Sequence, residues 1–216
     1  MIRAFLFDLD DTLAATAPLW RDAEEHLLQT IGAEWSAALA ARYKGMNAPD
    51  LATVVHGEIA PDLSLADCRQ TMRNRLLANF RQGPIDAIDG AIELVKRCRD
   101  RKVKMAVASG SPEQAIERAL RALGLSDCFD LTLSSEKVAR GKPHPDVYLA
   151  TAERLNVEPT DCLVFEDSRV GARAARTAGM TCIVRPSLPD ADMANVASRV
   201  VNDWREVTES DLTAGK

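Results

Sequence analysis

The stretch MIRAFLFDLDDTL, residues 1–13, decides the fold of this chain. Ile2–Phe7 is a short apolar run that predicts a buried strand, and the run stops at acidic residues. Asp8 and Asp10 stand at positions i and i+2, directly where this strand ends. Clustered carboxylates are electrostatically costly unless a cation binds them, and Mg²⁺ prefers oxygen ligands. The pattern therefore predicts a cation site at the end of the first strand.

Short apolar runs alternate with segments of helical period over much of the remaining chain. Further strands are predicted at Val103–Ala108, Cys162–Phe165 and Thr181–Val184, and helices at Pro112–Leu123, Asp146–Leu155 and Ser168–Ala178. The first of these helices is predicted to have Ser111 as its N-cap and proline as its first residue, and the last to end at Gly179. This alternation predicts an α/β fold, a Rossmann-like parallel sheet with helices on both faces. Such sheets bind ligands at the carboxyl ends of their strands.

One segment interrupts the alternation. From about Ala15 to Gln82 the chain shows helical patterns only, at Leu19–Thr30, Ala37–Tyr43 and Leu65–Phe80, before the breaker pair Gly83-Pro84. The simplest division is a split catalytic core, residues 1–14 and 86–216, with an inserted all-helical cap domain at 15–85.

Composition limits the classes of function. The 216 residues are 46% hydrophobic, and 27 basic against 32 acidic residues give a net charge of −5. This balance argues against a general nucleic-acid or membrane-surface binder. The five cysteines form no C-x-x-C pair, and no apolar run approaches the roughly 20 residues of a membrane span. We expect a cytoplasmic location, and a monomer because no apolar surface stripe stands out.

Four motifs together resemble those of the haloacid dehalogenase superfamily, over nearly the whole chain. The segment D-x-D-x-T at residues 8–12 resembles the first motif of its phosphotransferases. The other three follow in order: Ser109-Gly110 after a predicted strand, Gly141-Lys142-Pro143 in a stiff loop, and Glu166-Asp167-Ser168 after another strand. The resemblance implies a phosphoryl-transfer enzyme that works through an aspartyl-phosphate.

The resemblance also implies a role for each motif residue. Asp8 would attack phosphorus as the nucleophile, and Asp10 would act as general acid and base. Asp10 favours phosphate chemistry, because dehalogenases of the superfamily lack the second aspartate. Lys142 would be catalytic by screening the charge of nucleophile and phosphate. The implied phosphate-binding residues are Thr12, Ser109, Gly110 and Lys142. His144, in the same loop as Lys142, is assigned no chemistry.

The implied cofactor is Mg²⁺. Asp167 would bind it directly, together with a carboxylate oxygen of Asp8 and the main-chain oxygen of Asp10. Glu166 would either bind the ion or support one of its ligands.

The helical insert resembles the cap of the β-phosphoglucomutase-like subgroup, which also contains many sugar phosphatases. Candidate substrate residues on it are Trp20, Lys44 and Asn47. A tryptophan at helical spacing is more often a core residue, and Lys44 is equally compatible with a solvated surface. Mutases of the subgroup carry a histidine where this chain has Trp20, and an arginine after the Lys-Gly pair where it has Asn47-Ala48-Pro49.

These differences favour a phosphatase acting on a small phosphorylated metabolite, a sugar phosphate or a phosphorylated organic acid. Two alternatives remain open, a β-phosphoglucomutase-type mutase and a catalytically silent phosphate-binding protein.

Overall fold

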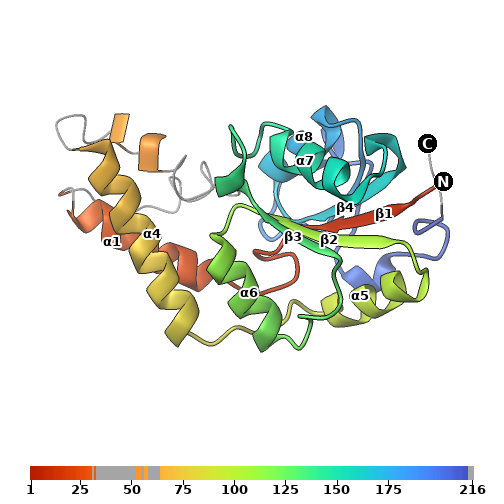
Figure 1. The fold of residues 1–216 in the computed structure, drawn as a ribbon, viewed down its shortest axis with the longest axis horizontal. Helices are drawn as coiled ribbons and strands as arrows, with labels where there is room; N and C mark the ends of the chain where they lie inside the picture. The colour runs from red at the N-terminus through yellow and green to blue at the C-terminus, as the bar shows by residue number, and fades with distance from the viewer. Residues whose placement is uncertain (31, 33–51, 55, 58–63, 214–216) are drawn as a thin grey trace.

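A parallel sheet of six strands, in the order β3-β2-β1-β4-β5-β6, forms the centre of the computed structural model (Figure 1). The structure describes residues 1–30, 32, 52–54, 56–57 and 64–213. The strands are β1 (Ala4–Phe7), β2 (Lys104–Ser109), β3 (Leu131–Ser134), β4 (Cys162–Glu166), β5 (Thr181–Val184) and β6 (Arg199–Val200). β1 lies between β2 and β4, with Leu6 opposite Ala106 on one side and Val164 on the other.

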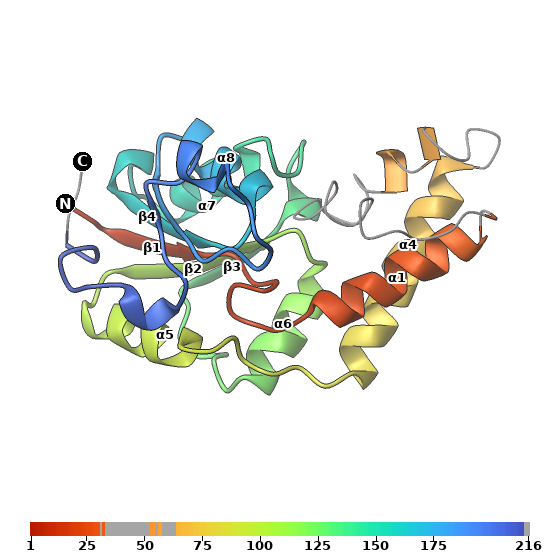
Figure 2. The ribbon, with the colours of Figure 1, turned by 180° about the vertical axis from the view of Figure 1, so that it is seen from behind.

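Helices cover both faces of this sheet (Figures 1 and 2). The described residues include the helices α1 (Ala17–Thr30), α4 (Leu65–Gln82), α5 (Ala91–Asp100), α6 (Glu113–Ala122), α7 (Asp146–Leu155) and α8 (Arg169–Thr177). Short 3-10 turns occur at Ser135–Lys137, Pro159–Asp161, Met193–Asn195 and Trp204–Glu206. The helices α5 and α6 lie on one face and α7 and α8 on the other, whereas α1 and α4 lie beyond the carboxyl ends of the strands.

Alternation of side chains along the strands creates two separate apolar cores. Phe5, Phe7 and Phe165 belong to the core under α5 and α6, and the rings of Phe7 and Phe165 stack with centroids 4.8 Å apart. Leu6 and Val164 belong to the core under α7 and α8. Both faces of the central strands are therefore buried, which explains why these strands are almost continuously apolar in sequence.

The chain leaves the sheet after β1 and returns to it before α5 at the same place. Ala15 donates a main-chain hydrogen bond to Asp86, at 2.8 Å, and Ile88 donates one to Leu13, at 2.9 Å. Residues 14 and 87 form an antiparallel bridge between these two crossings. We propose on this basis that residues 1–14 and 86–216 form a core and that 15–85 form the inserted cap.

α1 and α4 pack against each other, and α4 also contacts α6. Arg75 of α4 binds Asp22 of α1 through two hydrogen bonds, of 2.5 and 2.8 Å. Arg73 of α4 reaches Glu136, after β3, at 3.0 Å and Gln114 of α6 at 3.3 Å. Of these two arginines, Arg75 therefore holds α1 and α4 together, whereas Arg73 joins α4 to the segment that follows β3.

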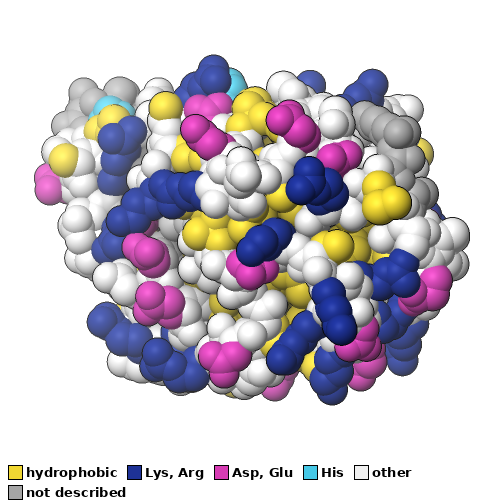
Figure 3. Space-filling model, turned by 45° about the vertical axis from the view of Figure 1, so that its right-hand side comes forward, with side chains coloured by type: hydrophobic (Ala, Val, Ile, Leu, Met, Phe, Trp, Pro, Cys, Tyr) yellow, Lys and Arg dark blue, Asp and Glu magenta, His cyan; other side chains and the backbone are white. Residues whose placement is uncertain are grey.

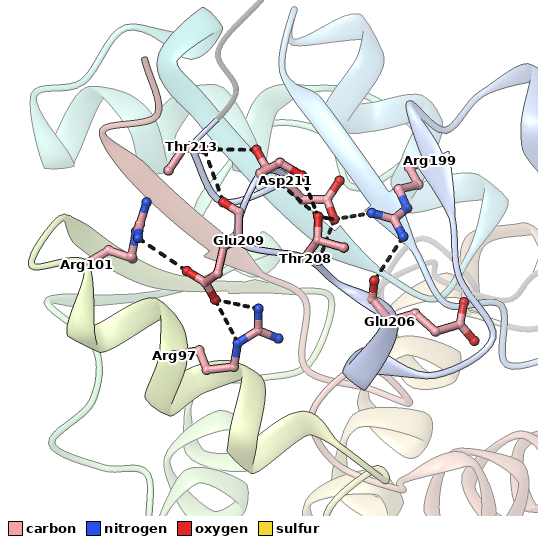
Figure 4. Close-up of polar contacts among 9 residues, drawn as sticks. Arg97, Arg101, Arg199, Glu206, Thr208, Glu209, Asp211 and Thr213 are labelled. Atoms are coloured by element: carbon pink, nitrogen blue, oxygen red, sulfur yellow. Dashed lines mark hydrogen bonds and ion pairs between the residues drawn. The ribbon is translucent and has the colours of Figure 1, made fainter.

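The last described segment is bound back onto α5 and β6 (Figure 4). Glu209 accepts hydrogen bonds from Arg97 of α5 and from Arg101, which directly follows this helix, at 2.7 and 3.3 Å. Arg199 binds Asp211. Trp204 is fully buried, and its indole Nε1 donates to the main-chain oxygen of Thr12 at 2.9 Å. Through Trp204 this segment supports the loop that follows β1.

The predicted strands and helices in the described residues are confirmed, apart from one helix start and three omissions. The prediction of Ser111 as an N-cap with Pro112 as the first helical residue is wrong. α6 begins at Glu113, and the Ser111 hydroxyl donates to Asp10 instead. β3, β6 and α5 were not expected, and β6, with two residues, is too short to carry a periodic signal. The predicted helix at residues 37–43 lies outside the described residues.

Among the described residues, no helix has the length and the apolar character required to cross a membrane.

Asp11 connects the loop after β1 to the start of α1. Its backbone adopts φ 58°, in the left-handed region that aspartate and asparagine tolerate better than most residues. Its Oδ1 accepts hydrogen bonds from the main-chain N–H groups of Thr16 and Ala17, at 3.1 and 3.0 Å. Asp11 therefore serves as the side-chain cap of the first turn of α1.

We expect Asp11→Ala to lower the free energy of unfolding by about 2 kcal/mol. About 1 kcal/mol comes from the lost cap and about 1 kcal/mol from alanine in the left-handed region. Asp11→Asn keeps an acceptor and tolerates the backbone, so it should lose less than half as much. Chemical denaturation measures the difference, and equal stability of the two variants would contradict the capping role.

Candidate active site

The site lies at the carboxyl ends of β1 and β4. In a sheet of this order, chain connections run outward in opposite directions from these two neighbouring strands, which is where open α/β sheets bind ligands. Asp8 directly follows β1, and its main-chain N–H donates to Phe165 at 2.9 Å. Glu166 is the last residue of β4, and Asp167 follows it. Strand pairing thus brings together two acidic motifs that are far apart in the sequence.

A buried lysine joins these two motifs. Lys142 Nζ lies 2.6 Å from Asp8 Oδ1 and 2.7 Å from Glu166 Oε1. The exposed fractions of the three side chains are 1%, 8% and 0%, so water does not compensate their charges. Breaking such a buried pair by removing one partner is strongly destabilising, at about 3–5 kcal/mol.

Hydrogen bonds fix Glu166 on both carboxylate oxygens. Oε1 accepts from the hydroxyl of Tyr148 at 2.7 Å, in addition to Lys142. Oε2 accepts from the main-chain N–H of Asp167 at 3.0 Å, and from the main-chain N–H and hydroxyl of Ser168 at 3.2 and 3.0 Å. The Tyr148 ring also lies under the Lys142 ammonium, 4.9 Å from Nζ to the ring centroid. This carboxylate therefore holds Lys142 in place.

Lys142 lies between two carboxyl groups, but their pKa values shift in opposite directions. Burial alone would lower the pKa of Lys142, but the carboxylates of Asp8 and Glu166 raise it above its ordinary value. Burial opposes ionisation of Glu166, yet Lys142 and the hydrogen-bond donors hold its pKa below the usual range. Burial raises the pKa of Asp8 well above its usual value, and Lys142 offsets only part of this effect. Of the two carboxyls, Asp8 is therefore the one whose charged form a further positive charge, in addition to Lys142, would stabilise more.

The three acidic side chains that follow β1 and β4 could hold a metal ion. Carboxylate oxygens of Asp8, Glu166 and Asp167 lie within 4.8 Å of one another. Asp167 is also oriented by the Ser187 hydroxyl, which donates to Oδ2 at 2.6 Å. These ligand atoms are all oxygens, and Lys142 compensates the burial of Asp8 only in part. Both features fit a hard divalent cation such as Mg²⁺. Because both oxygens of Glu166 already accept hydrogen bonds, Asp8 and Asp167 are the better placed ligands.

Asp10 has a different environment from Asp8. Ser109 and Ser111, at the end of β2, donate their hydroxyls to Asp10 Oδ2, each at 2.9 Å. The Thr16 hydroxyl and the indole Nε1 of Trp20 donate to Oδ1, at 2.8 and 2.9 Å. Hydroxyl and indole groups therefore surround Asp10, whereas an ammonium group contacts Asp8.

The structure places the remaining expected site residues as follows. The Ser109 hydroxyl accepts from the main-chain N–H of Ser111 at 2.9 Å, and Gly110 directly follows β2. The Thr12 hydroxyl is buried without a hydrogen-bond partner among the described residues. Lys44 and Asn47 lie outside the described residues.

Several residues of the site were not predicted from the sequence. Tyr148 faces inward from the first turn of α7, and Ser187 follows β5. Thr16 and Ser111 both donate hydroxyl groups to Asp10. The only sequence signal for Tyr148 was its apolar helix face, which equally describes a core residue.

A parallel sheet with a buried lysine and a carboxylate cluster at its switch point is typical of enzymes that act on small anionic substrates with the help of a cation. The family model of the haloacid dehalogenase-like hydrolases matches residues 2–179. The chain therefore belongs to this family.

Individual relatives cover nearly the whole chain. Hexitol phosphatase B of Escherichia coli K12 is 31% identical over 229 residues, which cover 99% of this chain and 95% of the relative. Two solved structures are similar in fold. CbbY of Rhodobacter sphaeroides, in complex with phosphate, has a TM-score of 0.85 at 28% identity and covers 99% of this chain and 100% of its own. β-Phosphoglucomutase of Clostridium difficile has a TM-score of 0.86 at 25% identity, with 99% and 96% covered.

We expect Mg²⁺ to stabilise the protein through the acidic cluster. At one hundred times the dissociation constant, binding to the folded state adds about 2.7 kcal/mol, or roughly 5–10 °C in Tm for a chain of this size. Thermal unfolding with Mg²⁺ and with chelator measures this shift. Asp167→Asn should remove most of it, and Asp192→Asn, at an exposed carboxylate, should leave it intact. A full shift in Asp167→Asn would place the ion elsewhere.

Gly171, in the first turn of α8, lets this helix approach Glu166. A Cβ at this position would lie 1.7 Å from Glu166 Oε1 and 2.0 Å from Cδ. Gly171→Ala must therefore displace the carboxylate that holds Lys142, and we expect a loss of at least about 3 kcal/mol in the free energy of unfolding. Denaturation of this variant beside Arg173→Ala, an exposed position on the same helix, provides the test. Equal stability of the two variants would show that Glu166 can move without cost.

Proposed function

We propose that this protein is a Mg²⁺-dependent phosphatase that hydrolyses a small phosphate monoester through an aspartyl-phosphate on Asp8. The observation that carries the proposal is the pair of carboxyls two residues apart with opposite surroundings. Asp8 lies against the buried Lys142, whereas Asp10 accepts hydrogen bonds from hydroxyls and an indole. Two carboxyls in different environments can perform two different tasks.

The first half-reaction uses Asp8 as the nucleophile. A carboxylate oxygen of Asp8 attacks phosphorus and forms an acyl phosphate, while the bond from phosphorus to the substrate oxygen breaks. Asp10 donates a proton to the departing oxygen, so the substrate leaves as an alcohol. Lys142, which already contacts Asp8, offsets negative charge on the nucleophile and on the phosphoryl oxygens.

The second half-reaction releases phosphate. Asp10, now a carboxylate, takes a proton from water, and the water oxygen attacks phosphorus and frees the Asp8 carboxylate. We assign to Ser109, the last residue of β2, to Gly110, which follows it, and to Thr12 the role of donating hydrogen bonds to phosphoryl oxygens. Asp8, Asp167 and the main-chain oxygen of Asp10 would hold Mg²⁺, which would supply positive charge to offset the negative charge of the phosphoryl group. Glu166 acts by holding Lys142.

The substrate class follows from the relatives. Hexitol phosphatase B acts, by its name, on phosphorylated hexitols, and we propose a sugar phosphate or a phosphorylated organic acid for this chain. We further propose a monomer in the cytoplasm. The five cysteines are all free thiols, as expected in a reducing compartment.

A mutase is the second candidate, because β-phosphoglucomutase has the same fold. A mutase must protect its aspartyl-phosphate from water and hold a substrate with two phosphates. This chain has Trp20 and residues 47–49 where that subgroup carries a histidine and an arginine. Conversion of a hexose 1-phosphate distinguishes the two, since a phosphatase yields free phosphate and a mutase yields hexose 6-phosphate.

Release of inorganic phosphate from a panel of sugar phosphates and small phosphorylated acids tests the proposal. We expect release in the presence of Mg²⁺ and none with chelator. Asp8→Asn should abolish release, because the covalent bond cannot form. Asp10→Asn should lower kcat by about 10²–10⁴-fold, the usual contribution of a general acid–base group. Unchanged release in Asp8→Asn would disprove the covalent mechanism, and a silent binding protein would show no release in any variant.

A further inference from the structure

Asp10 lies at the junction between the sheet and the first helix that leaves it. Two of its hydrogen-bond donors come from the end of β2: Ser109 is the last residue of the strand, and Ser111 lies in the loop that follows it. Of the other two, Thr16 directly precedes α1 and Trp20 lies in its first turn. The two serines donate to Oδ2 of Asp10, whereas Thr16 and Trp20 donate to Oδ1.

The donor from Trp20 differs in kind from the other three. A hydroxyl can rotate and can donate or accept, whereas an indole N–H only donates and does not titrate in the accessible range. The Trp20 ring packs against the apolar core that lies under α5 and α6 and continues between α1 and α4. Apolar packing therefore fixes the direction of this N–H, and its distance to Asp10 Oδ1 is 2.9 Å.

We propose that Trp20 is a positioning residue that orients the Asp10 carboxyl for proton transfer, rather than a wall of the substrate pocket. The inference rests on the proposed function only for the role of Asp10. Without the indole, Oδ1 retains Thr16, whose hydroxyl can rotate away, and the carboxyl can turn about its own bond. A small misplacement of a catalytic group can lower a rate by about 10²-fold.

The expected signature is a dependence on the leaving group. An alkyl phosphate needs a proton on its departing oxygen, whereas p-nitrophenyl phosphate releases a stable phenolate and needs little help from an acid. The ratio kcat/KM reports the steps up to the first irreversible one, which here is transfer of the phosphoryl group to Asp8. Loss of orientation at Asp10 should therefore lower kcat/KM for the alkyl ester far more than for the aryl ester.

Trp20→Phe removes the N–H group and keeps an aromatic ring. We expect its kcat/KM to fall by roughly 10–100-fold for an alkyl phosphate and by less than about threefold for p-nitrophenyl phosphate. Asp10→Asn should show the same selectivity, and adding Trp20→Phe to it should have little further effect. Gln29→Ala, at an exposed position of α1, is the control and should match the wild type. Equal losses for both esters, expressed mainly in KM, would instead identify Trp20 as a substrate contact and overturn the proposal.

A second measurement does not depend on activity. The chain has three tryptophans, so its ¹⁵N–¹H spectrum contains three indole signals, and the one missing from Trp20→Phe belongs to Trp20. We expect this signal to shift and to exchange faster with solvent in Asp10→Ala. The Trp204 indole, which donates to Thr12, serves as the internal reference. A Trp20 signal that does not move in Asp10→Ala would overturn the proposal. A shifted signal in this variant, together with a wild-type protein that releases no phosphate, would refute the proposed function alone.

Discussion

The burial of Lys142 between Asp8 and Glu166 is the constraint on which the rest of the site depends. Removing an ammonium and two carboxylates from water costs several kcal/mol per ion unless each charge is compensated. Here Tyr148 and Ser168 complete the hydrogen bonding of Glu166, and Gly171 leaves the room that its carboxylate occupies. One interaction thus joins the end of β1, the end of β4 and the loop before α7.

This arrangement makes Asp8 and Asp10 chemically different, although only one residue separates them. Lys142 satisfies Glu166 fully and Asp8 only in part, so the environment of Asp8 still favours additional positive charge. A divalent cation would supply this positive charge. It would also offset the negative charge of a phosphoryl group bound beside Asp8. Asp10 contacts neutral donors, which suits the acid–base role proposed for it.

The short segment from Asp8 to Ala17 carries the proposed nucleophile, the proposed acid–base residue and the beginning of α1. Asp11 caps this helix, and Thr16 and Trp20 return from it to Asp10. Trp204, from the far end of the chain, supports the same loop through Thr12. The first helix beyond the sheet is therefore coupled to the Asp10 carboxyl by hydrogen bonds within about one helical turn. The orientation of α1 and the geometry of Asp10 cannot vary independently.

The sequence alone determined the central strands, the helices α1, α4, α7 and α8, and the four motifs at the carboxyl ends of the strands. These features are local, because apolar runs, caps and loop residues leave signals within a few positions. It did not reveal β3, β6 or α5, and it misassigned Ser111 as a helix cap. Only the tertiary structure decided that Ser111 and Trp20 donate to Asp10 and that Tyr148 and Glu166 hold Lys142. These contacts join residues from 10 to 101 positions apart, and a partner chosen by packing leaves no periodic trace in the chain.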